Sequence, residues 1–168
     1  MMNHNENLIP VVKGSDLMSI GDVSTISGYI PISQLKKRTT VDIYDSKDQS
    51  GEQKYQRSPN PKRIRDISEG LRQRKFDVPT ALTFNIREGE WDPSYMEKRD
   101  GGYFLNLDKM RESNVQFHIM DGQHRSNGYI GMLGRFEELD QGEPSTEYQE
   151  WKDFKIPFVS TLGLSAKD

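Results

Sequence analysis

Five consecutive residues, Asp121, Gly122, Gln123, His124 and Arg125, bring together an acid, a glycine, an imidazole and a guanidinium. The Arg125 side chain offers a two-pronged donor suited to phosphate, and His124 can donate or accept a hydrogen bond near neutral pH. Gly122 permits a positive φ or the close approach of a ligand. Asp121 can cap a helix, polarise His124 or hold a hydrated Mg²⁺ beside a phosphate.

The elements on either side of this segment determine what it can bind. Val115–Met120 alternates as a strand does, and the residues after Arg125 carry apolar side chains at helical spacing. A strand that turns into a helix leaves unpaired backbone N–H groups at the positive end of the helix dipole. The pattern predicts an anion site here and leaves the identity of the anion open. Each residue also has a structural alternative: Asp121 as a helix cap, His124 as a structural hydrogen-bonding residue and Arg125 as a surface residue.

The predicted helix after Arg125 contains Gly128, Gly131 and Gly134, spaced three residues apart. Each glycine costs about 1 kcal/mol relative to alanine in a helix. This cost is tolerable if another segment of backbone packs closely against the helix at these positions.

A second helix is predicted at Pro61–Arg74, because Asn60 is a favourable N-cap and proline is favoured at the first helical position. Its basic residues are candidates for DNA binding: Lys62, Arg63, Arg65 and Arg72. These residues lie on both sides of the apolar stripe, so the helix presents no single basic face.

Composition limits the classes of function. The 168 residues include 23 Lys and Arg against 26 Asp and Glu, 33% hydrophobic residues and no cysteine. The length fits one domain, and the absence of cysteine excludes disulfides, thiolate nucleophiles and iron–sulfur clusters. No apolar stretch is long enough to span a membrane, so we expect a cytoplasmic protein. No third ligand can be named beside His118 and His124, so no metal site is predicted.

Charge is unevenly distributed along the sequence. Residues 36–75 carry twelve basic and six acidic side chains, a net charge of +6, whereas residues 137–153 carry seven acids and one lysine, a net charge of −6. Both segments can be solvated faces. Alternatively, the first is a surface for a polyanion and the second is a solubilising acidic loop.

The remaining pattern predicts an α+β protein. Leu8–Val12 and Gly28–Leu35 are expected to be edge strands, because glycine and proline interrupt them. Thr80–Ile86 and Lys155–Leu162 are predicted to be strands. Residues 87–102 are predicted to be a surface loop. Tyr103–Leu107 and Val115–Met120 are predicted to pair as a hairpin.

The segment Asp121–Arg125, spelled DGQHR, is similar to the signature of the DGQHR-domain family, whose best-known branch is the DndB-like proteins of DNA sulfur (phosphorothioate) modification. The order Tyr55-Gln56-Arg57, basic helix, strand, hairpin, DGQHR, helix and Ile156–Val159 strand resembles the ParB/sulfiredoxin-like fold. This resemblance implies a mixed sheet with helices and the motif at a strand-to-helix turn. It also implies an N-terminal extension over residues 1–27 and a DGQHR domain over residues 28–168, as the N-terminal part of longer family members.

The resemblance further implies which residues surround a phosphate: Arg57, Gly122, Gln123, His124 and Arg125. For a hydrolytic step, Asp121 and His124 are the candidate catalytic residues, with ATP or CTP and Mg²⁺ as the implied cofactors. DndB-like proteins look like transcriptional regulators of DNA-modification genes, and related members are associated with ATP hydrolysis.

The sequence is therefore compatible with three functions. The first is nucleotide or phosphate binding in a DNA-modification or defence system, with NTP hydrolysis open. The second is a DNA-binding regulator without catalysis. The third is a ParB-like nuclease, for which Asp108, Glu112 and His118 are further candidates. The sequence leaves open the oligomeric state and whether this domain contacts DNA.

Overall fold

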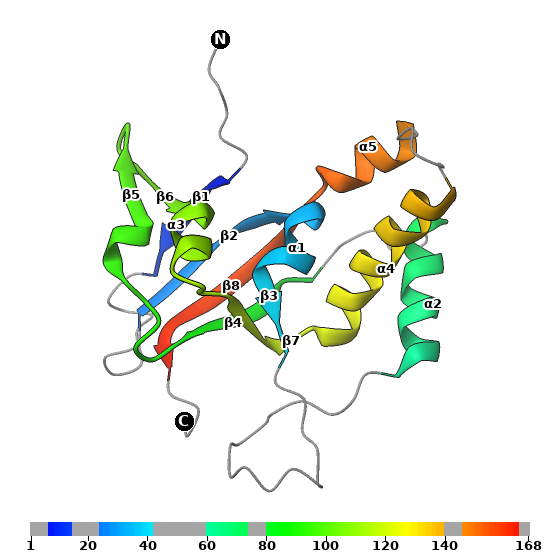
Figure 1. Cartoon of the computed structure of the whole chain (residues 1–168), viewed down its shortest axis with the longest axis horizontal. Coiled ribbons are helices and arrows are strands. Elements are labelled where there is room, and N and C mark those ends of the chain that lie inside the picture. The colour runs from blue at the N-terminus through cyan, green and yellow to red at the C-terminus, as the bar shows by residue number, and fades with distance from the viewer. Residues whose placement is uncertain (1–6, 15–23, 42–59, 74–79, 140–145, 165–168) are drawn as a thin grey trace, which may run out of the picture.

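The computed structural model describes residues 7–14, 24–41, 60–73, 80–139 and 146–164, which build a mixed sheet with helices around it (Figure 1). The strands are β1 (Leu8–Lys13), β2 (Ser24–Pro31), β3 (Thr39–Thr40), β4 (Leu82–Arg87), β5 (Met96–Arg99), β6 (Gly102–Asn106), β7 (Phe117–Asp121) and β8 (Lys155–Leu164). The helices are α1 (Ile32–Arg38), α2 (Pro61–Arg72), the 3₁₀ turn η1 (Pro93–Tyr95), α3 (Leu107–Glu112), α4 (Gln123–Leu139) and α5 (Thr146–Lys152). The predicted α+β class is confirmed.

The order of strands in the sheet is β3-β7-β4-β8-β2-β1-β6-β5. β4 runs parallel to β8 and antiparallel to β7, and β7 is parallel to β3. In the view of Figure 1, α1 and α3 lie in front of the sheet, whereas α2 and α4 lie side by side at its right-hand end. The end of β7 is therefore where the sheet meets the α2 and α4 pair.

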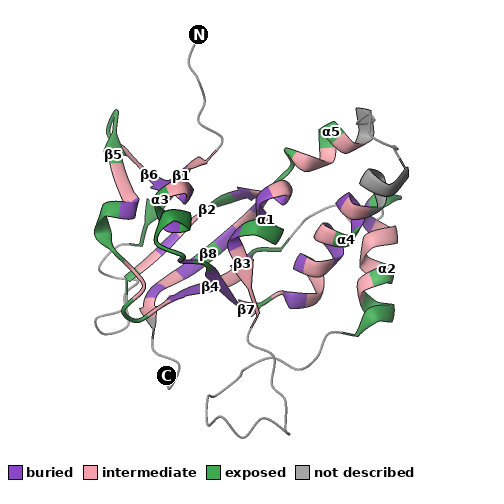
Figure 2. Cartoon of the chain, viewed as in Figure 1, coloured by how far each residue is buried: buried purple, intermediate pink, exposed green. Residues whose placement is uncertain are grey.

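The core lies between the sheet and these helices, as the buried residues of Figure 2 show. Phe84, Phe117 and Phe158 come from β4, β7 and β8, respectively, and their ring centroids are 5.0 to 5.5 Å apart. Fully burying a side chain of this size contributes about 1.5–3 kcal/mol. This aromatic cluster holds the three strands on which the DGQHR segment depends.

The prediction that Leu8–Val12 and Gly28–Leu35 form edge strands is wrong. β1 lies between β2 and β6, and β2 lies between β1 and β8. Pro10 and Gly28 each favour an edge when considered alone. However, the apolar residues Ile9, Val11 and Ile26 are buried on the core face, and that burial keeps both strands inside the sheet.

The second half of the Gly28–Leu35 prediction is also wrong, because the chain becomes helical after Pro31. Ile32 and Leu35 are three residues apart and are both buried, as a helix face requires. The Ile32 N–H donates to the Phe154 carbonyl, which holds the start of α1 against the segment before β8.

The predicted hairpin between Tyr103–Leu107 and Val115–Met120 is wrong as well. β6 pairs with β1 and β5, whereas β7 pairs with β3 and β4. The connection contains α3, whose first turn is capped by the Asn106 side chain accepting from the Lys109 N–H. Leu107 and Met110 are buried, so this helix packs onto the core and carries the chain between two distant strands.

The regions expected to be loops contain further elements. The surface loop predicted at residues 87–102 contains η1 and β5. The acidic segment at residues 137–153 contains the end of α4 together with α5. The strand predictions at Thr80–Ile86 and Lys155–Leu162 are confirmed as β4 and β8. The predicted domain boundary at residue 28 stays a prediction; β1 and the start of β2 come before it and pair within the same sheet. Within the described residues, no helix combines the length and apolar character needed to cross a membrane.

Candidate functional site

The turn between β7 and α4 is tight and is built around Gly122. β7 ends at Asp121, α4 begins at Gln123, and the Gly122 carbonyl accepts from the Ser126 N–H at 2.8 Å. Gly122 has a φ of +92°, and a Cβ added to it would lie 2.5 Å from Leu82 Cδ2. Glycine is therefore required here both by the backbone conformation and by the lack of space. The predicted strand-to-helix turn is confirmed, with Gly122 rather than Asp121 directly before the helix.

The Arg125 side chain folds back over this turn. Its Nη1 donates to the Ala81 carbonyl at 3.3 Å, and its Nη2 lies 3.6 Å from Asp121 Oδ2. A Cβ on Gly122 would lie 3.0 Å from the same Nη2. The Arg125 side chain is 28% exposed and that of Asp121 is 80% exposed, so this pair is open to solvent and contributes little stability. The guanidinium is held in place and is still accessible to an anion.

The charge on Arg125 also acts inside the protein. Burial raises the pKa of the Tyr129 hydroxyl, and the positive charge of Arg125 opposes that rise. Tyr129 lies one helical turn after Arg125 on α4 and is 3% exposed. The Arg125 guanidinium therefore lies at the boundary between the buried side of α4, which holds Tyr129, and the solvent-exposed side.

Gln123 and Ser126 complete the first turn of α4 on its buried side. They are 4% and 0% exposed, respectively. The Ser126 hydroxyl has no hydrogen-bond partner among the residues that the structure describes. Buried polar atoms usually have a hydrogen-bond partner. The Ser126 hydroxyl has none in the described residues, so it is available for a hydrogen bond close to the turn.

His124 contacts a segment far away in the sequence. Its Nε2 accepts a hydrogen bond from the Asn60 N–H at 3.2 Å. Asn60 caps α2, because its side-chain Oδ1 accepts from the Lys62 and Arg63 N–H groups. The predicted cap and the start of this helix at Pro61 are confirmed, and the helix ends at Arg72 rather than Arg74.

α2 packs along α4 through the glycines of α4. A Cβ on Gly128 would lie 2.4 Å from Ile67 Cγ2, and the Ser68 hydroxyl donates to the Gly128 carbonyl at 2.8 Å. A Cβ on Gly131 would lie 3.2 Å from the Ser68 hydroxyl oxygen, whereas a Cβ on Gly134 would meet open space. Close packing of another backbone is found at Gly128, Gly131 faces a side-chain hydroxyl, and Gly134 has no such neighbour.

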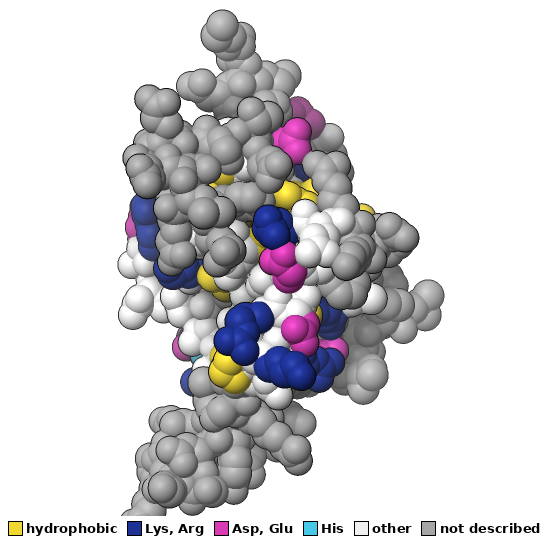
Figure 3. Space-filling view, turned by 90° about the vertical axis from the view of Figure 1, so that its right-hand side faces the viewer, with side chains coloured by type: hydrophobic (Ala, Val, Ile, Leu, Met, Phe, Trp, Pro, Cys, Tyr) yellow, Lys and Arg dark blue, Asp and Glu magenta, His cyan; other side chains and the backbone are white. Residues whose placement is uncertain are grey.

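The outer face of α2 carries the basic residues proposed for DNA binding, and Figure 3 shows basic and acidic side chains interspersed on this side of the molecule. Lys62, Arg63 and Arg65 are exposed. Arg72 is also exposed, but its Nε donates to Glu69 at 3.2 Å. The three residues near the start of the helix are therefore the better candidates for contacting a polyanion.

The remaining predictions concern Arg57 and the residues considered as ligands for a metal ion. Arg57, expected to face the same phosphate, lies outside the described residues. Within the described ranges no group of three or more His, Asp or Glu side chains could hold a metal ion. Asp108 and His118 instead face other protein groups: Asp108 lies 3.4 Å from Arg111, and His118 lies 3.4 Å from Glu90.

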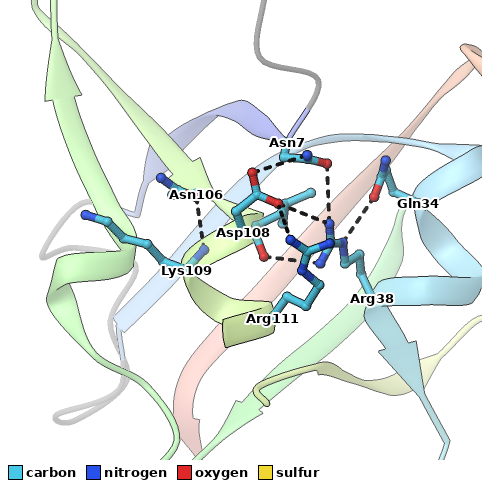
Figure 4. A network of polar contacts seen from close by, with 8 residues as sticks. Asn7, Gln34, Arg38, Asn106, Asp108, Lys109 and Arg111 are labelled. Atoms are coloured by element: carbon cyan, nitrogen blue, oxygen red, sulfur yellow. Dashed lines mark hydrogen bonds and ion pairs between the residues drawn. The ribbon is translucent and has the colours of Figure 1, made fainter. Parts of the chain in front are cut away.

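A buried arginine that has no distinguishing sequence pattern, Arg38, joins three segments (Figure 4). It is 6% exposed and donates to Gln34 Oε1 at 3.1 Å, the Leu107 carbonyl at 3.2 Å and Asn7 Oδ1 at 3.3 Å. Asp108 lies 3.8 Å away and also faces Arg111. Burial and the charge of Arg111 lower the pKa of Arg38, and Asp108 opposes this effect. In the sequence, Arg38 looks like the last member of an exposed Lys-Lys-Arg run.

A family model described as DndB, DNA-sulfur modification-associated, matches residues 19–167, which is most of the chain. The chain belongs to the DndB family. The resemblance of the DGQHR segment to DndB-like proteins is thereby confirmed, and DndB membership links the chain to DNA sulfur modification systems. Comparisons with curated proteins and with solved structures find no match.

Proposed function

We propose that this DndB-family chain binds a phosphate group of a nucleotide at the turn between β7 and α4, as part of a DNA sulfur modification system. The observation that carries the proposal is the position of Arg125. Its guanidinium lies against Gly122 and is partly exposed, beside backbone N–H groups at the first turn of a helix. Such groups and the helix dipole favour a bound anion.

Two further observations support the proposal. The Ser126 hydroxyl is buried without a hydrogen-bond partner in the described residues, one turn into the same helix. In the described part of the chain, the carboxylate that faces Arg125 is that of Asp121, which is 80% exposed and 3.6 Å away. A phosphate that offers two oxygens would make a stronger bidentate contact with the guanidinium. We extend the proposal to a ParB/sulfiredoxin-like arrangement of this domain, with Arg57 facing the same phosphate.

The experiment is a thermal-shift panel with ATP, CTP, GTP, UTP and inorganic pyrophosphate, each with and without Mg²⁺. A ligand at a hundredfold excess over its Kd stabilises the folded state by about 2.7 kcal/mol, which raises the Tm by several degrees. Arg125→Ala should abolish the rise. Arg99→Ala is the matched control, because that arginine lies on β5 at the opposite end of the sheet and is 59% exposed. A flat response of the wild type to the whole panel would remove the proposal.

Hydrolysis of the bound nucleotide, with Asp121 and His124 as the reacting groups and Mg²⁺ as the cofactor, stays a prediction. The same holds for cytoplasmic localisation and for a nuclease activity, which no specific observation favours.

A DNA-binding regulator is the second candidate, and the observation that favours it is the exposure of Lys62, Arg63 and Arg65 at one end of α2. If these residues contact phosphates, changing each to Gln should lower the slope of log K against log salt by about 0.9. Arg72→Gln is the control, because Arg72 already pairs with Glu69 and should change the slope less. Slopes equal to that of the wild type in all four variants would exclude this surface as a DNA contact.

A further inference from the structure

His124 and Asn60 join the starting ends of two helices. Figure 1 shows α2 and α4 side by side, and both helices begin at the end of the molecule where β7 stops. Gly128 and Ser68 hold the helices together farther along their length. At the starting ends of the helices, the Asn60 N–H donates a hydrogen bond to His124 Nε2.

This hydrogen bond fixes the chemical state of the imidazole. A ring nitrogen accepts a hydrogen bond only when it carries no proton, so Nε2 is bare and the neutral ring holds its proton on Nδ1. A protonated ring would place a second donor against the Asn60 N–H. While this hydrogen bond holds, His124 Nε2 carries no proton to donate to a phosphate, and its lone pair is engaged by the Asn60 N–H.

The cap at Asn60 is complete only with His124. The Asn60 side chain accepts from the Lys62 and Arg63 N–H groups at 3.0 and 3.3 Å, which leaves the Asn60 N–H as the donor that His124 satisfies. The bond therefore orients the first turn of α2 and sets the position of Lys62 and Arg63 relative to the Gly122 turn.

We propose that His124 is a positioning residue in the neutral Nδ1–H form, which holds the start of α2 beside the β7–α4 turn and so sets the affinity of that turn for phosphate. The part of this inference that concerns affinity rests on the proposed function. The part that concerns the imidazole and Asn60 can be tested without any ligand.

The ligand-free test uses the full chain labelled with ¹⁵N. The sequence contains three histidines, so the His124 ring signals are assigned by their loss in His124→Gln. The expected result is a ring with Nδ1 protonated and Nε2 unprotonated. Exchange of the Asn60 amide proton should accelerate on the order of tenfold in His124→Ala, the loss of one net hydrogen bond. It should be restored in His124→Gln, whose side-chain oxygen can accept in place of Nε2.

The ligand test is a titration of the same three proteins with inorganic pyrophosphate. Affinity should fall on the order of tenfold in His124→Ala and recover in His124→Gln, with amide exchange in β2 unchanged as the control for folding. A proton on Nε2, or a glutamine variant as weak as the alanine variant, would overturn the inference. If the wild type binds no pyrophosphate or nucleotide, the proposed function fails, while the ring spectrum and the Asn60 exchange still decide the role of His124.

Discussion

At the scale of single residues, the candidate site depends on Gly122 and Arg125 fitting together. Gly122 has a positive φ, and the space beside its Cα is taken by Leu82 and by the Arg125 guanidinium. The glycine therefore does more than allow a turn, because it lets the guanidinium come close to the backbone. A side chain at this position would displace the group that we propose binds phosphate.

Gly122→Ala should lower stability by more than Gly101→Ala. Both glycines have positive φ values, +92° and +80°, so both variants incur the strain of about 1–2 kcal/mol for that conformation. Only the Gly122 variant adds a crowded Cβ, because a Cβ on Gly101 would meet no atom beyond its chain neighbours within 4 Å. Urea denaturation measures the difference, and pyrophosphate binding should be lost only in Gly122→Ala. Equal losses of stability with binding retained would contradict this account of the turn.

The residue types of the site could be predicted from the sequence, whereas their partners could not. An acid, a glycine, a histidine and an arginine in five positions are visible without a structure. The bond between Asn60 and His124 joins residues 64 positions apart, and the Ala81 carbonyl that accepts from Arg125 carries no sequence signal because every residue has a carbonyl. Such contacts arise from the fold and cannot be read from local pattern.

At the scale of elements, the pairing of α2 with α4 positions the first turn of both helices. The two helices approach closely because Gly128 has no side chain where Ile67 packs. Gly134 lies farther along the same helix and has no such neighbour. The two glycines therefore have different roles although they share a helix and a spacing.

Gly128→Ala and Gly134→Ala should change stability in opposite directions. The added Cβ at Gly128 would lie 2.4 Å from Ile67 Cγ2 and should push α2 away, destabilising the protein by about 1–3 kcal/mol. The Cβ at Gly134 meets open space, so the higher helix propensity of alanine should stabilise by up to about 1 kcal/mol. Thermal unfolding of the two variants measures both signs. A stabilising Gly128→Ala would contradict the packing.

Elements with local signals were predicted better than elements set by pairing. Asn60 followed by Pro61 is sufficient to locate the start of α2, because capping and the fixed φ of proline act within one turn. The helix after Pro31 (α1) and the helix between β6 and β7 (α3) are not predicted from the sequence. In both places a short apolar run suits a strand or a helix, and burial against distant segments decides between them.

At the scale of the whole molecule, a polar network joins segments that are distant in the sequence (Figure 4). Arg38 at the end of α1 holds Asn7 before β1 and the start of α3. The Leu107 N–H also donates to the Asn7 carbonyl at 2.7 Å. The network ties the first described segment to the middle of the chain.

Arg38→Met should destabilise the protein by about 3 kcal/mol, because it removes a buried cation and leaves its acceptors unpaired. Lys36→Met is the control, since this residue lies on the same helix and is exposed. It should change stability by less than about 0.5 kcal/mol. Denaturant titration of both variants provides the measurement, and similar small losses in both would show that the network contributes no stability.

Glu97 should contribute to the loss of stability in acid. The hydrogen bond from Asn106 is the largest cause that lowers the pKa of Glu97, and burial opposes it; the charges of Arg99 and Lys109 lower the pKa further. Because its folded-state pKa lies below the unfolded value of about 4.3, its stabilising contribution is present at neutral pH and lost as the pH falls through the folded-state pKa. Glu97→Gln should flatten the dependence of the free energy of unfolding on pH below about pH 4.3, relative to the wild type. A pH dependence equal to that of the wild type would contradict this assignment.

The central claim, that phosphate binds at the turn between β7 and α4, is tested most directly by following backbone amide NMR signals during a pyrophosphate titration of the full chain. The account predicts that the largest shifts occur at the Gly122–Arg125 amides and that Arg125→Ala abolishes them. Shifts concentrated in another part of the chain, or no shift at millimolar pyrophosphate, would contradict it.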